Sequence, residues 1–381
     1  MPHWQRETLR SGASMTLGQT YELKLPKFGM LGSLVIYLAS TAITDAFVSL
    51  PKWRLIDYIS KIEIMGDGST LIKSFDGVEA LAAAFYDDGR LPVGMWRTYS
   101  TTPQRQWIPI HFGRFLQDEL YGLDLSKFNE VTLKISNDGT AALWNTDITA
   151  NIFGYFLREG GGFGAGYFRE EVWKSYQPVA GEVEYNNLPV AYPIRRALLE
   201  ARPGRNTADC KNTDTMRDLM SDIDFTFRTG QVRVYKDSLE HLGHLSVLEG
   251  YGEVETRGSI HRTQGYGFEC GVGYVTNNLG YGAADAGGIT TALANMSKDV
   301  QDSAQEMAYN PANGPLAWVV RGHGFGHCTP LWIARKADLS DMLDPAALEA
   351  VKVDITCLST ATIAGTARNA RNGIILSRLV R

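Results

Sequence analysis

The segment Ser60–Leu81, SKIEIMGDGSTLIKSFDGVEAL, decides the fold, because the chain repeats its pattern 161 residues later. The repeat is Ser221–Leu242, SDIDFTFRTGQVRVYKDSLEHL, and the two segments align without a gap. Each reads as an alternating strand, a tight turn that contains glycine, a second strand, and an Asp that caps a following helix. Self-similarity over such a long period is typical of a duplicated structural unit.

A second pair of segments follows in the same order. Ile108–Ser136, IPIHFGRFLQDELYGLDLSKFNEVTLKIS, matches the pattern of Thr329–Thr356, TPLWIARKADLSDMLDPAALEAVKVDIT. In each, a Pro begins an aromatic and apolar strand, an Arg lies five residues further on, and an alternating strand closes the segment. This pair is offset by 221 residues, so the second copy holds 60 more residues between its matched blocks than the first copy does. We place this insertion within residues 247–326, which are rich in Gly, Ala and Tyr.

The repeat sets the predicted domain organisation. Residues 21–159 form the first unit and residues 181–381 the second, and a glycine-rich linker over residues 160–180 joins them. Residues 1–20 are expected to form an N-terminal arm that docks on a neighbouring molecule, or that is disordered until assembly. The segment 355–381 is a basic C-terminal stretch.

Strand patterns dominate the chain, and helical periodicity is confined to short pieces such as Val78–Phe85. Many short strands with turns between them predict an all-β fold of two tandem jelly rolls, with short helices and one large loop insertion in the second roll. The strongest strand patterns are Tyr21–Leu25, Ser33–Leu38, Ile59–Met65, Val131–Ile135, Asn151–Leu157, Ile223–Phe227, Val232–Tyr235 and Val351–Ile355.

Composition excludes several classes of protein. A formal net charge of -5 over 381 residues is mild and argues against a surface covered with nucleic-acid contacts. The four cysteines are scattered, without a CxxC pair, so they form neither a disulfide framework nor a standard zinc site. The N-terminal residues lack the apolar core of a signal peptide, and no apolar run approaches the length of a membrane span. We therefore expect a soluble protein.

Histidines are the candidates for chemistry. RGHGFGHC contains His323 and His327 beside Cys328, and EHLGH contains His241 and His244. Together they suggest a possible metal site, but the glycines of the first motif favour a turn and no fourth ligand or general base is evident. The His-x-His pattern with a later Glu and His that double-cupin enzymes use is also missing. We expect a structural role for these histidines, no metal or other cofactor, and no enzymatic activity.

Two further groups of side chains are candidates for contacts with other molecules. The arginines of the C-terminal stretch face packaged nucleic acid or the head groups of an internal membrane, or they lie solvated at the rim of a final strand; they are Arg368, Arg371, Arg378 and Arg381. An apolar stripe at helical spacing within the insertion is expected to be buried between subunits or beneath the insertion. Its residues are Ile289, Leu293, Met296, Val300, Ala304 and Met307.

The motifs also resemble those of a known family. Ile62-Glu63-Ile64 before a glycine turn, then Ile108 to Phe112, Leu123-Asp124-Leu125 and Val131 to Ile135, are similar to the double jelly-roll major capsid proteins of tailless icosahedral DNA viruses. That family has Leu-Pro-Leu where this chain has Leu-Asp-Leu, and the second copy keeps only part of the Ile-Pro-Leu strand.

The resemblance implies a major capsid protein made in the host cytoplasm and located in the virion. Three copies would assemble as a pseudo-hexameric trimer that tiles an icosahedral shell. The implied partners are further copies of the chain and minor capsid or vertex proteins, with packaged DNA or an internal membrane on the inner face. Two alternatives stay open: a metal-dependent or glycan-binding protein on a paired jelly-roll scaffold, and a minor capsid or spike protein.

Overall fold

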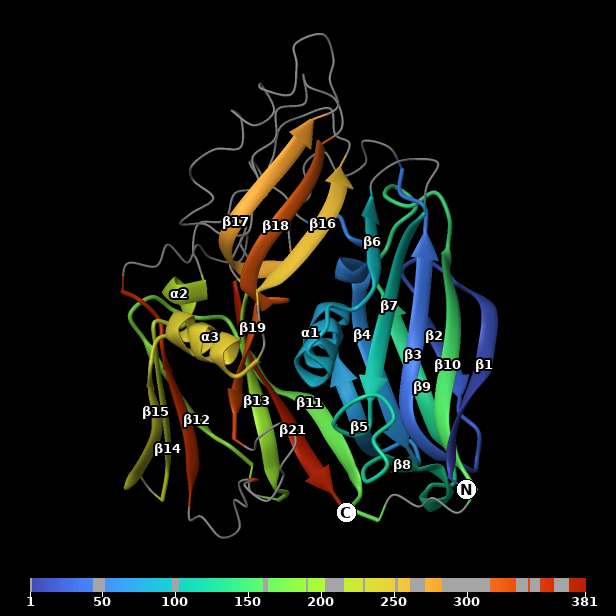
Figure 1. Ribbon diagram of the computed structural model, residues 1–381, viewed down its shortest axis with the longest axis horizontal. Coiled ribbons are helices and arrows are strands. Elements are labelled where there is room, and N and C mark those ends of the chain that lie inside the picture. Colours follow the sequence, from blue (N-terminus) through green and yellow to red (C-terminus); the bar gives the residue numbers. More distant parts are fainter. Residues whose placement is uncertain are drawn as a thin grey trace.

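The computed structural model describes residues 2–43, 52–97, 103–159, 164–189, 191–202, 216–228, 230–250, 253–260, 271–282, 316–333, 342, 350–359 and 370–381. These residues form two jelly rolls that stand side by side, with both chain ends at the base and three strands of the insertion at the top (Figure 1). The predicted fold class is therefore confirmed. No helix in the described residues has the length and apolar character needed to cross a membrane.

The first roll is made of two sheets that face each other. Four strands in the order β1-β10-β3-β7 form one sheet, and four in the order β2-β9-β4-β5 form the other. The strands are β1 (His3–Met15), β2 (Thr20–Lys24), β3 (Met30–Ser40), β4 (Ile59–Gly66), β5 (Thr70–Phe75), β7 (Gln104–His111), β9 (Val131–Asn137) and β10 (Ile148–Arg158). The shorter elements of this roll are η1 (Leu55–Tyr58), α1 (Gly77–Asp88), β6 (Gly94–Arg97), β8 (Leu123–Asp124) and η2 (Leu125–Lys127).

The second roll repeats the first strand by strand. Its sheets have the orders β11-β21-β13-β19 and β12-β20-β14-β15, which are the orders of the first roll with every strand replaced by its counterpart. The strands are β11 (Tyr167–Tyr176), β12 (Val183–Asn187), β13 (Ile194–Arg202), β14 (Asp222–Phe227), β15 (Val232–Asp237), β19 (Cys328–Trp332), β20 (Val351–Thr356) and β21 (Arg371–Val380). Helices α2 (Met216–Leu219) and α3 (Leu239–Leu248) accompany them, and α3 follows β15 as α1 follows β5.

Two parallel strand pairs connect the parts of the molecule. β5 of the first roll pairs with β11 of the second, so that one eight-stranded sheet runs through both rolls. β6 pairs with β16 of the insertion, and the first roll's other sheet thereby continues into β16 (Val254–Ile260), β18 (Leu316–Phe325) and β17 (Val272–Gly282). The insertion is thus an extension of a sheet in the first roll, although its residues come from the second copy.

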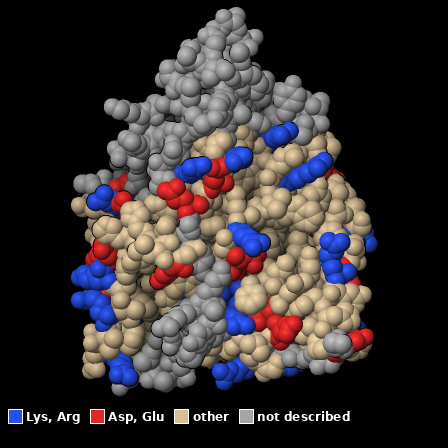
Figure 2. Space-filling model, in the orientation of Figure 1, with Lys and Arg blue, Asp and Glu red and all other residues tan. Residues whose placement is uncertain are grey.

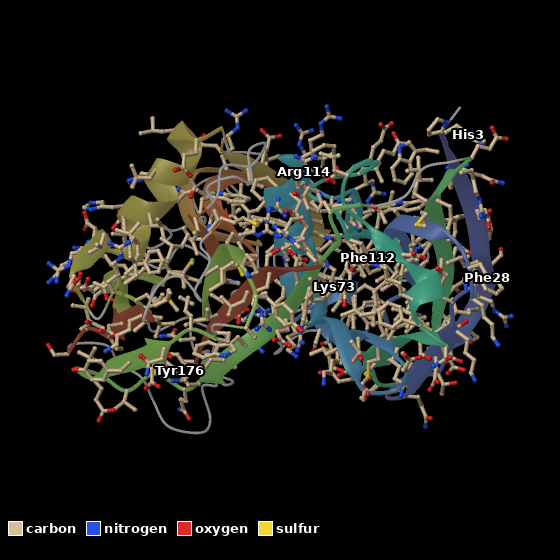
Figure 3. The ribbon with its side chains drawn as sticks, turned by 90° about the horizontal axis from the view of Figure 1, so that it is seen from below. His3, Phe28, Lys73, Phe112, Arg114 and Tyr176 are labelled. Carbon is tan, nitrogen blue, oxygen red and sulfur yellow. The ribbon has the colours of Figure 1, made fainter. Side chains whose placement is uncertain are left out.

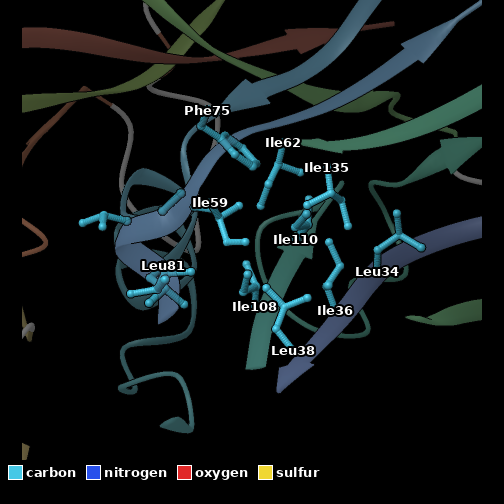
Figure 4. Packing of buried hydrophobic residues seen from close by; sticks show 14 of the residues in the cluster. Leu34, Ile36, Leu38, Ile59, Ile62, Phe75, Leu81, Ile108, Ile110 and Ile135 are labelled. Atoms are coloured by element: carbon cyan, nitrogen blue, oxygen red, sulfur yellow. The ribbon is translucent and has the colours of Figure 1, made fainter. Parts of the chain in front are cut away.

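Alternation of apolar and polar residues explains where the core lies. Ile62 and Ile64 of β4 point inward and are fully buried, as are Ile36 of β3 and Ile108 of β7 from the opposite sheet. Figure 4 shows Ile62, Ile36 and Ile108 meeting between the two sheets of the first roll, and Ile64 belongs to the same cluster. Full burial of an Ile or Leu side chain stabilises the fold by about 1.5–3 kcal/mol. A second cluster between the sheets of the second roll includes Leu199, Ile223, Phe225, Val353 and Leu376.

One predicted helix start is confirmed, and the other lies one residue later than predicted. Asp76 caps α1, because its carboxylate accepts a hydrogen bond from the Glu79 N–H at 2.9 Å, while the Glu79 carboxylate accepts one from the Asp76 N–H at 2.6 Å. In the second roll the cap of α3 is Ser238 rather than the predicted Asp237. Asp237 instead accepts from the Ser238 N–H and pairs with His241, since a carboxylate one residue before the cap is too far back to reach the free N–H groups.

Two predicted domain boundaries are wrong. Residues 3–15, expected to form an arm, make up β1, which pairs with β10 and is the first strand of the first roll. Residues 167–176, expected to be linker, make up β11, the first strand of the second roll. Both strands were missed because they carry many charges. β1 is a largely exposed edge strand, and the charges of β11 are buried in ion pairs rather than solvated.

Candidate functional site

The four histidines lie on three elements. His241 and His244 are exposed on α3, His323 is buried on β18, and His327 is buried in the turn before β19. The ring centroids of His244 and His323 are 4.8 Å apart, and those of His241 and His244 are 6.4 Å apart. Burial, together with the neighbouring His244, lowers the pKa of His323 to about 4. His323 is therefore neutral at physiological pH.

These histidines do not form a metal site of three converging ligands. Within the described residues, the group of three ligand atoms that do lie within 4.8 Å of one another belongs to Asp76, Glu79 and Glu200 instead. The Nδ1 atom of His241 pairs with Asp237 at 2.8 Å. The turn predicted for this motif is found at His327, whose N–H donates to the Gly324 carbonyl at 3.0 Å and whose φ is 61°. His323 lies in strand β18 instead, so the prediction of a turn is wrong there. The geometry gives no support to a metal-dependent activity at the histidines.

The junction between the two rolls holds a buried set of charges, which we call the central ion network. It consists of Lys73 of β5, Asp87 of α1, Glu170 of β11, and Arg195 and Arg196 of β13. Lys73 Nζ lies 2.7 Å from Glu170 Oε2, and Arg196 bridges Glu170 at 3.0 Å and Asp87 at 2.8 Å. Figure 3, seen from below, places Lys73 where the first roll meets the second.

Electrostatics in this network favour the charged form of Glu170. Burial alone would raise the pKa of Glu170, but the charges of Lys73 and Arg196 outweigh burial and lower this pKa to about 2. Burial lowers the pKa of Lys73, and Glu170 opposes that effect. Arg195 completes the network with a 3.0 Å pair to Asp87 and a contact of its guanidinium with the ring of Phe168. Each charge therefore has an opposite charge within hydrogen-bond reach.

A second set of charges, the acid–arginine cluster, lies at the start of α1, where two of its carboxylates are buried and its other side chains are partly exposed. Asp76 and Glu79 of the first roll meet Glu200 and Arg202 of β13 and Arg371 of β21. Arg202 is 2.7 Å from Asp76 and 2.5 Å from Glu200. Arg371 reaches all three carboxylates, at 3.1 Å, 2.5 Å and 2.8 Å for Asp76, Glu79 and Glu200.

Three carboxylates face two guanidinium groups in this cluster, so one negative charge is in excess. Burial and the charges of Asp76 and Glu200 raise the pKa of Glu79 to about 8. Burial would also raise the pKa of Asp76, but Arg202 and Arg371 outweigh it and lower that pKa to about 2. Glu79 therefore holds the proton that balances the cluster. The guanidinium groups occupy the space between the carboxylates, which makes the cluster a clamp between the rolls rather than a cation site.

Helix α1 fills the rest of the junction. The Tyr86 hydroxyl donates to the Cys328 carbonyl at 2.7 Å, and the rings of Phe85 and Phe325 lie 5.2 Å apart. Gly326, with φ 64°, lies against Val78. A helix of the first roll thus packs directly on strands of the second. Leu198, Cys328 and Ile375 of the second roll join the core cluster of the first roll, while the interior of the second roll forms a cluster of its own.

The predicted basic tail is largely a buried strand. Arg371 belongs to the acid–arginine cluster, and Arg378 forms a buried ion pair with Glu171. The expectation of an arginine facing nucleic acid, a membrane or solvent is therefore wrong for Arg378, since β21 lies inside the eight-stranded sheet. The Arg371 side chain is 33% exposed and bound to carboxylates of the cluster. Arg381 is exposed beyond the end of β21. Arg368 lies outside the described residues, as do Ile289, Leu293, Met296, Val300 and Met307 of the apolar stripe.

Sequence reasoning missed the two charge clusters, although a signal was present. Glu170-Glu171 and Arg195-Arg196 are pairs of like charges in strand segments whose remaining residues are mostly apolar or aromatic. A charged pair in such a segment must either face solvent or meet opposite charges when buried. Which of the two applies depends on the neighbouring roll, and the order of residues along the chain does not show that neighbour.

Comparison with known proteins is informative at the level of structure only. No family model matches the sequence, and no curated protein matches it. Solved structures do match over nearly the whole chain. The STIV (Sulfolobus turreted icosahedral virus) MCP has a TM-score of 0.57 at 11% identity, covering 99% of this chain and 97% of its own.

Two further structures agree with it. The capsid of PBCV-1 gives a TM-score of 0.56 at 9% identity, covering 99% of this chain and 93% of the matched chain. The major capsid protein P2 from bacteriophage PM2 gives 0.53 at 8% identity, covering 100% and 98%. The resemblance to double jelly-roll major capsid proteins is thus confirmed for the fold, from one end of the chain to the other.

Proposed function

We propose that this protein is the major capsid protein of an icosahedral virion, a structural subunit that acts by self-assembly. The observation that carries the proposal is the duplicated roll. Both copies have the same strand orders, and β5, α1 and the two charge clusters join them into a single unit. The likeness in fold to capsid proteins of three different viruses supports the same role.

Duplication suits a subunit that must tile a closed shell. A shell made of locally sixfold positions needs six similar units around each centre, and a chain with two rolls supplies them with three copies. The two rolls stand side by side in the same orientation (Figure 1), as this arrangement requires. We therefore propose a trimer with pseudo-hexagonal outline as the building block of the shell, and the virion as its location.

The inner and outer ends of the subunit would then have different partners. The insertion extends one end beyond the rolls, while both chain ends lie at the opposite end (Figure 1). We propose that the insertion faces outward and that the base meets what the shell encloses, packaged DNA or an internal membrane. Minor capsid or vertex proteins would fill the positions where the hexagonal packing is interrupted.

The proposal is tested by the mass and shape of the purified chain. Light scattering is expected to give three times 42.1 kDa, and electron microscopy of the same sample is expected to show particles with a hexagonal outline, or shells built from them. A chain that stays monomeric at every accessible concentration and never forms shells contradicts the proposal.

A further inference from the structure

A partly open cavity of about 260 Å³ lies at one end of the second roll, beside the last residue of β11, the end of β20 and the start of β21. Tyr176 and Asn372 line it, and they are the partners farthest from the C-terminus in the pairing of β11 with β21. Because the C-terminus lies at the base (Figure 1), the cavity lies at the opposite end of the roll. Figure 3 shows Tyr176 well away from Lys73, which marks the junction with the first roll.

The same place in the first roll is closed by a side chain. The Asn137 N–H donates to the Gln19 carbonyl at 3.2 Å, and in the second roll the Cys357 N–H donates to the Glu182 carbonyl at 3.0 Å, so Cys357 is the counterpart of Asn137. The Asn137 amide donates to two carbonyls of the loop before β2, at 2.9 and 3.0 Å, and accepts from an N–H of that loop at 2.8 Å. The Cys357 thiol donates to the Asp218 carbonyl instead, at 3.3 Å. The end that an amide closes in the first roll therefore stays open in the second.

Two polar side chains also replace apolar ones in this region. Strand registers place Ala150 and Asn372 at equivalent points of β10 and β21. Ala13 is opposite the first of these residues, and Tyr176 is opposite the second. Ala13 and Ala150 are buried in the apolar core of the first roll. The second roll thus departs from the duplicated pattern at the cavity, and departures of this kind are typical of functional sites.

The amide of Asn372 is only partly satisfied by the chain. Asn372 is 1% exposed, and its Nδ2 donates to the Leu219 carbonyl at 3.0 Å and to the Tyr176 hydroxyl at 3.5 Å. A carbonyl can only accept, so Nδ2 must stay on that side of the amide. Its Oδ1 accepts no hydrogen bond from any described residue, and a buried acceptor without a donor is costly. Because Asn372 lines the cavity, a donor bound there can complete its hydrogen bonding.

The walls of the cavity carry an excess of negative charge. Glu182 and Glu184 both line it. Lys174 pairs with Glu184, and its Nζ lies 5.5 Å from the centre of the Tyr176 ring. Glu182 forms no ion pair with a described residue, so one carboxylate is in excess. Over much of the face drawn in Figure 2, by contrast, acidic and basic side chains lie side by side.

The other groups at the cavity narrow the class of ligand. Burial, with the charge of Glu184, raises the pKa of Tyr176, so its hydroxyl stays neutral. Pro178, Val179 and Ile355 give the remaining walls an apolar surface. A ligand that fits has one positive charge, N–H donors at one end and an apolar chain at the other. A primary alkylammonium has these properties, since its head group carries three donors.

A metal ion fits less well. Ca²⁺ takes about six to eight oxygen ligands, usually with several carboxylates among them. One of the two carboxylates at this cavity is already paired with Lys174. That pair also shows that an ammonium group is accepted beside Tyr176.

We propose that the cavity binds a primary ammonium group on an alkyl chain. The ammonium would donate to Asn372 Oδ1 and to the Glu182 carboxylate, and the alkyl chain would lie along Pro178 and Val179 towards solvent. A free amine and the side chain of a lysine from another protein chain present the same group, so either can be the source. The site lies within one roll and does not depend on the proposed capsid role.

Calorimetric titration of the purified chain with n-butylammonium chloride tests the proposal. Binding is expected, whereas tetramethylammonium chloride, which has the same charge but no N–H donor, is expected not to bind. Glu182→Gln should weaken butylammonium binding about tenfold, the usual effect of losing a charged hydrogen-bond partner. Glu182 is exposed, so this variant should keep the thermal midpoint of the native chain. The matched control is Glu119→Gln, on an exposed loop of the first roll, which should change neither binding nor midpoint.

Cys357→Asn provides a second test, because it introduces the side chain that closes the first roll. This variant is expected to abolish butylammonium binding. Three results would each overturn the proposal: no butylammonium binding at millimolar concentration, which leaves a water molecule as the partner of Asn372; equal binding of tetramethylammonium; and binding that neither Cys357→Asn nor Glu182→Gln changes.

The same titration on assembled chains distinguishes the two sources of the ammonium group. Butylammonium that binds the subunit and the assembled chains alike identifies a free amine as the natural ligand. Butylammonium that binds only the subunit identifies a lysine of a neighbouring chain, which fills the cavity on assembly. Both results support an ammonium site.

Discussion

Lys73 and Glu170 form a buried ion pair, 2.7 Å between Nζ and Oε2, that joins β5 of the first jelly roll to β11, the first strand of the second roll. Glu170 also binds Arg196, so this carboxylate is paired with two cations, whereas Lys73 is paired with one carboxylate. Buried pairs add little net stability compared with apolar packing, but removing one partner leaves an uncompensated charge. The junction therefore depends on Glu170 more than on Lys73.

We predict that Glu170→Gln lowers the free energy of unfolding by about 3–5 kcal/mol, because Lys73 loses the carboxylate that it is paired with and Arg196 keeps only its pair with Asp87. Lys73→Met should cost less, since Glu170 keeps Arg196. Urea unfolding of both variants measures the difference. The control is Lys24→Met, whose solvent-exposed pair with Glu130 should leave the free energy of unfolding nearly unchanged. Equal effects of the two buried substitutions would contradict the assigned role of Glu170.

Acid should weaken the same junction. The pKa of Glu170 is lowered to about 2 in the folded chain, whereas an unperturbed Glu titrates near 4.3. A lowered folded-state pKa stabilises the fold above the unfolded pKa, and this stability is lost as the pH falls from about 4.3 towards 2. The loss attributable to Glu170 is about 3 kcal/mol. Unfolding midpoints between pH 7 and pH 3 measure it, and the Glu170→Gln variant should show a shallower decline than the native chain.

Glu79 should behave in the opposite way. Its pKa is raised to about 8, so the stability that it contributes is fully present below about pH 4.3 and is lost as the pH rises through 8. Glu79→Gln keeps the neutral form and should be tolerated at pH 8, with a flatter stability profile between pH 5 and 8. Glu200→Gln, the matched control, removes a carboxylate that binds both Arg202 and Arg371 and should cost about 3 kcal/mol or more. If the two variants are equally destabilised, the proton is not on Glu79.

Metal removal should have no effect on folding. In the described residues His241, His244, His323 and His327 do not bring three ligand atoms together, and the acids that do converge bind arginines. Dialysis against a chelator is therefore expected to leave the thermal unfolding midpoint unchanged, and added Zn²⁺ is expected not to raise it. A midpoint that falls by several degrees on chelation would contradict this prediction and would indicate that the histidines bind a metal ion.

The duplicated pattern made most of the fold predictable. Ile62 with Ile223, and Pro109 with Pro330, occupy equivalent places in the two rolls, because alternation and turn residues are local features that survive in each copy. The strands that sequence reasoning missed, β1 and β11, are the first strands of their rolls. Their inward contacts come from residues more than a hundred positions away, so their own residues show little alternation.

The candidate site was less predictable for a similar reason. Arg371 and Arg378 lie in a sequence segment without any acidic residue, a pattern that predicts a basic tail. Their counter-charges, Glu79 and Glu171, are supplied by other elements once the rolls are joined. Local sequence shows the charge of a side chain, while its burial and partners depend on the packing of one roll against the other.

Strand β1 offers the sharpest test of the corrected domain boundary. Trp4 packs against Gly32 of β3, and β1 pairs along its length with β10. Deleting residues 1–15 should therefore expose β10 as a new edge and lower the thermal midpoint of the subunit by several degrees or make it insoluble. Trp4→Ala, which keeps the strand but removes its largest buried contact, should cost about 2–4 kcal/mol. If residues 1–15 were an arm that acts only in assembly, the truncated subunit would keep its unfolding midpoint and lose only its association. Circular dichroism measures the midpoint and light scattering measures the association, both on the same sample.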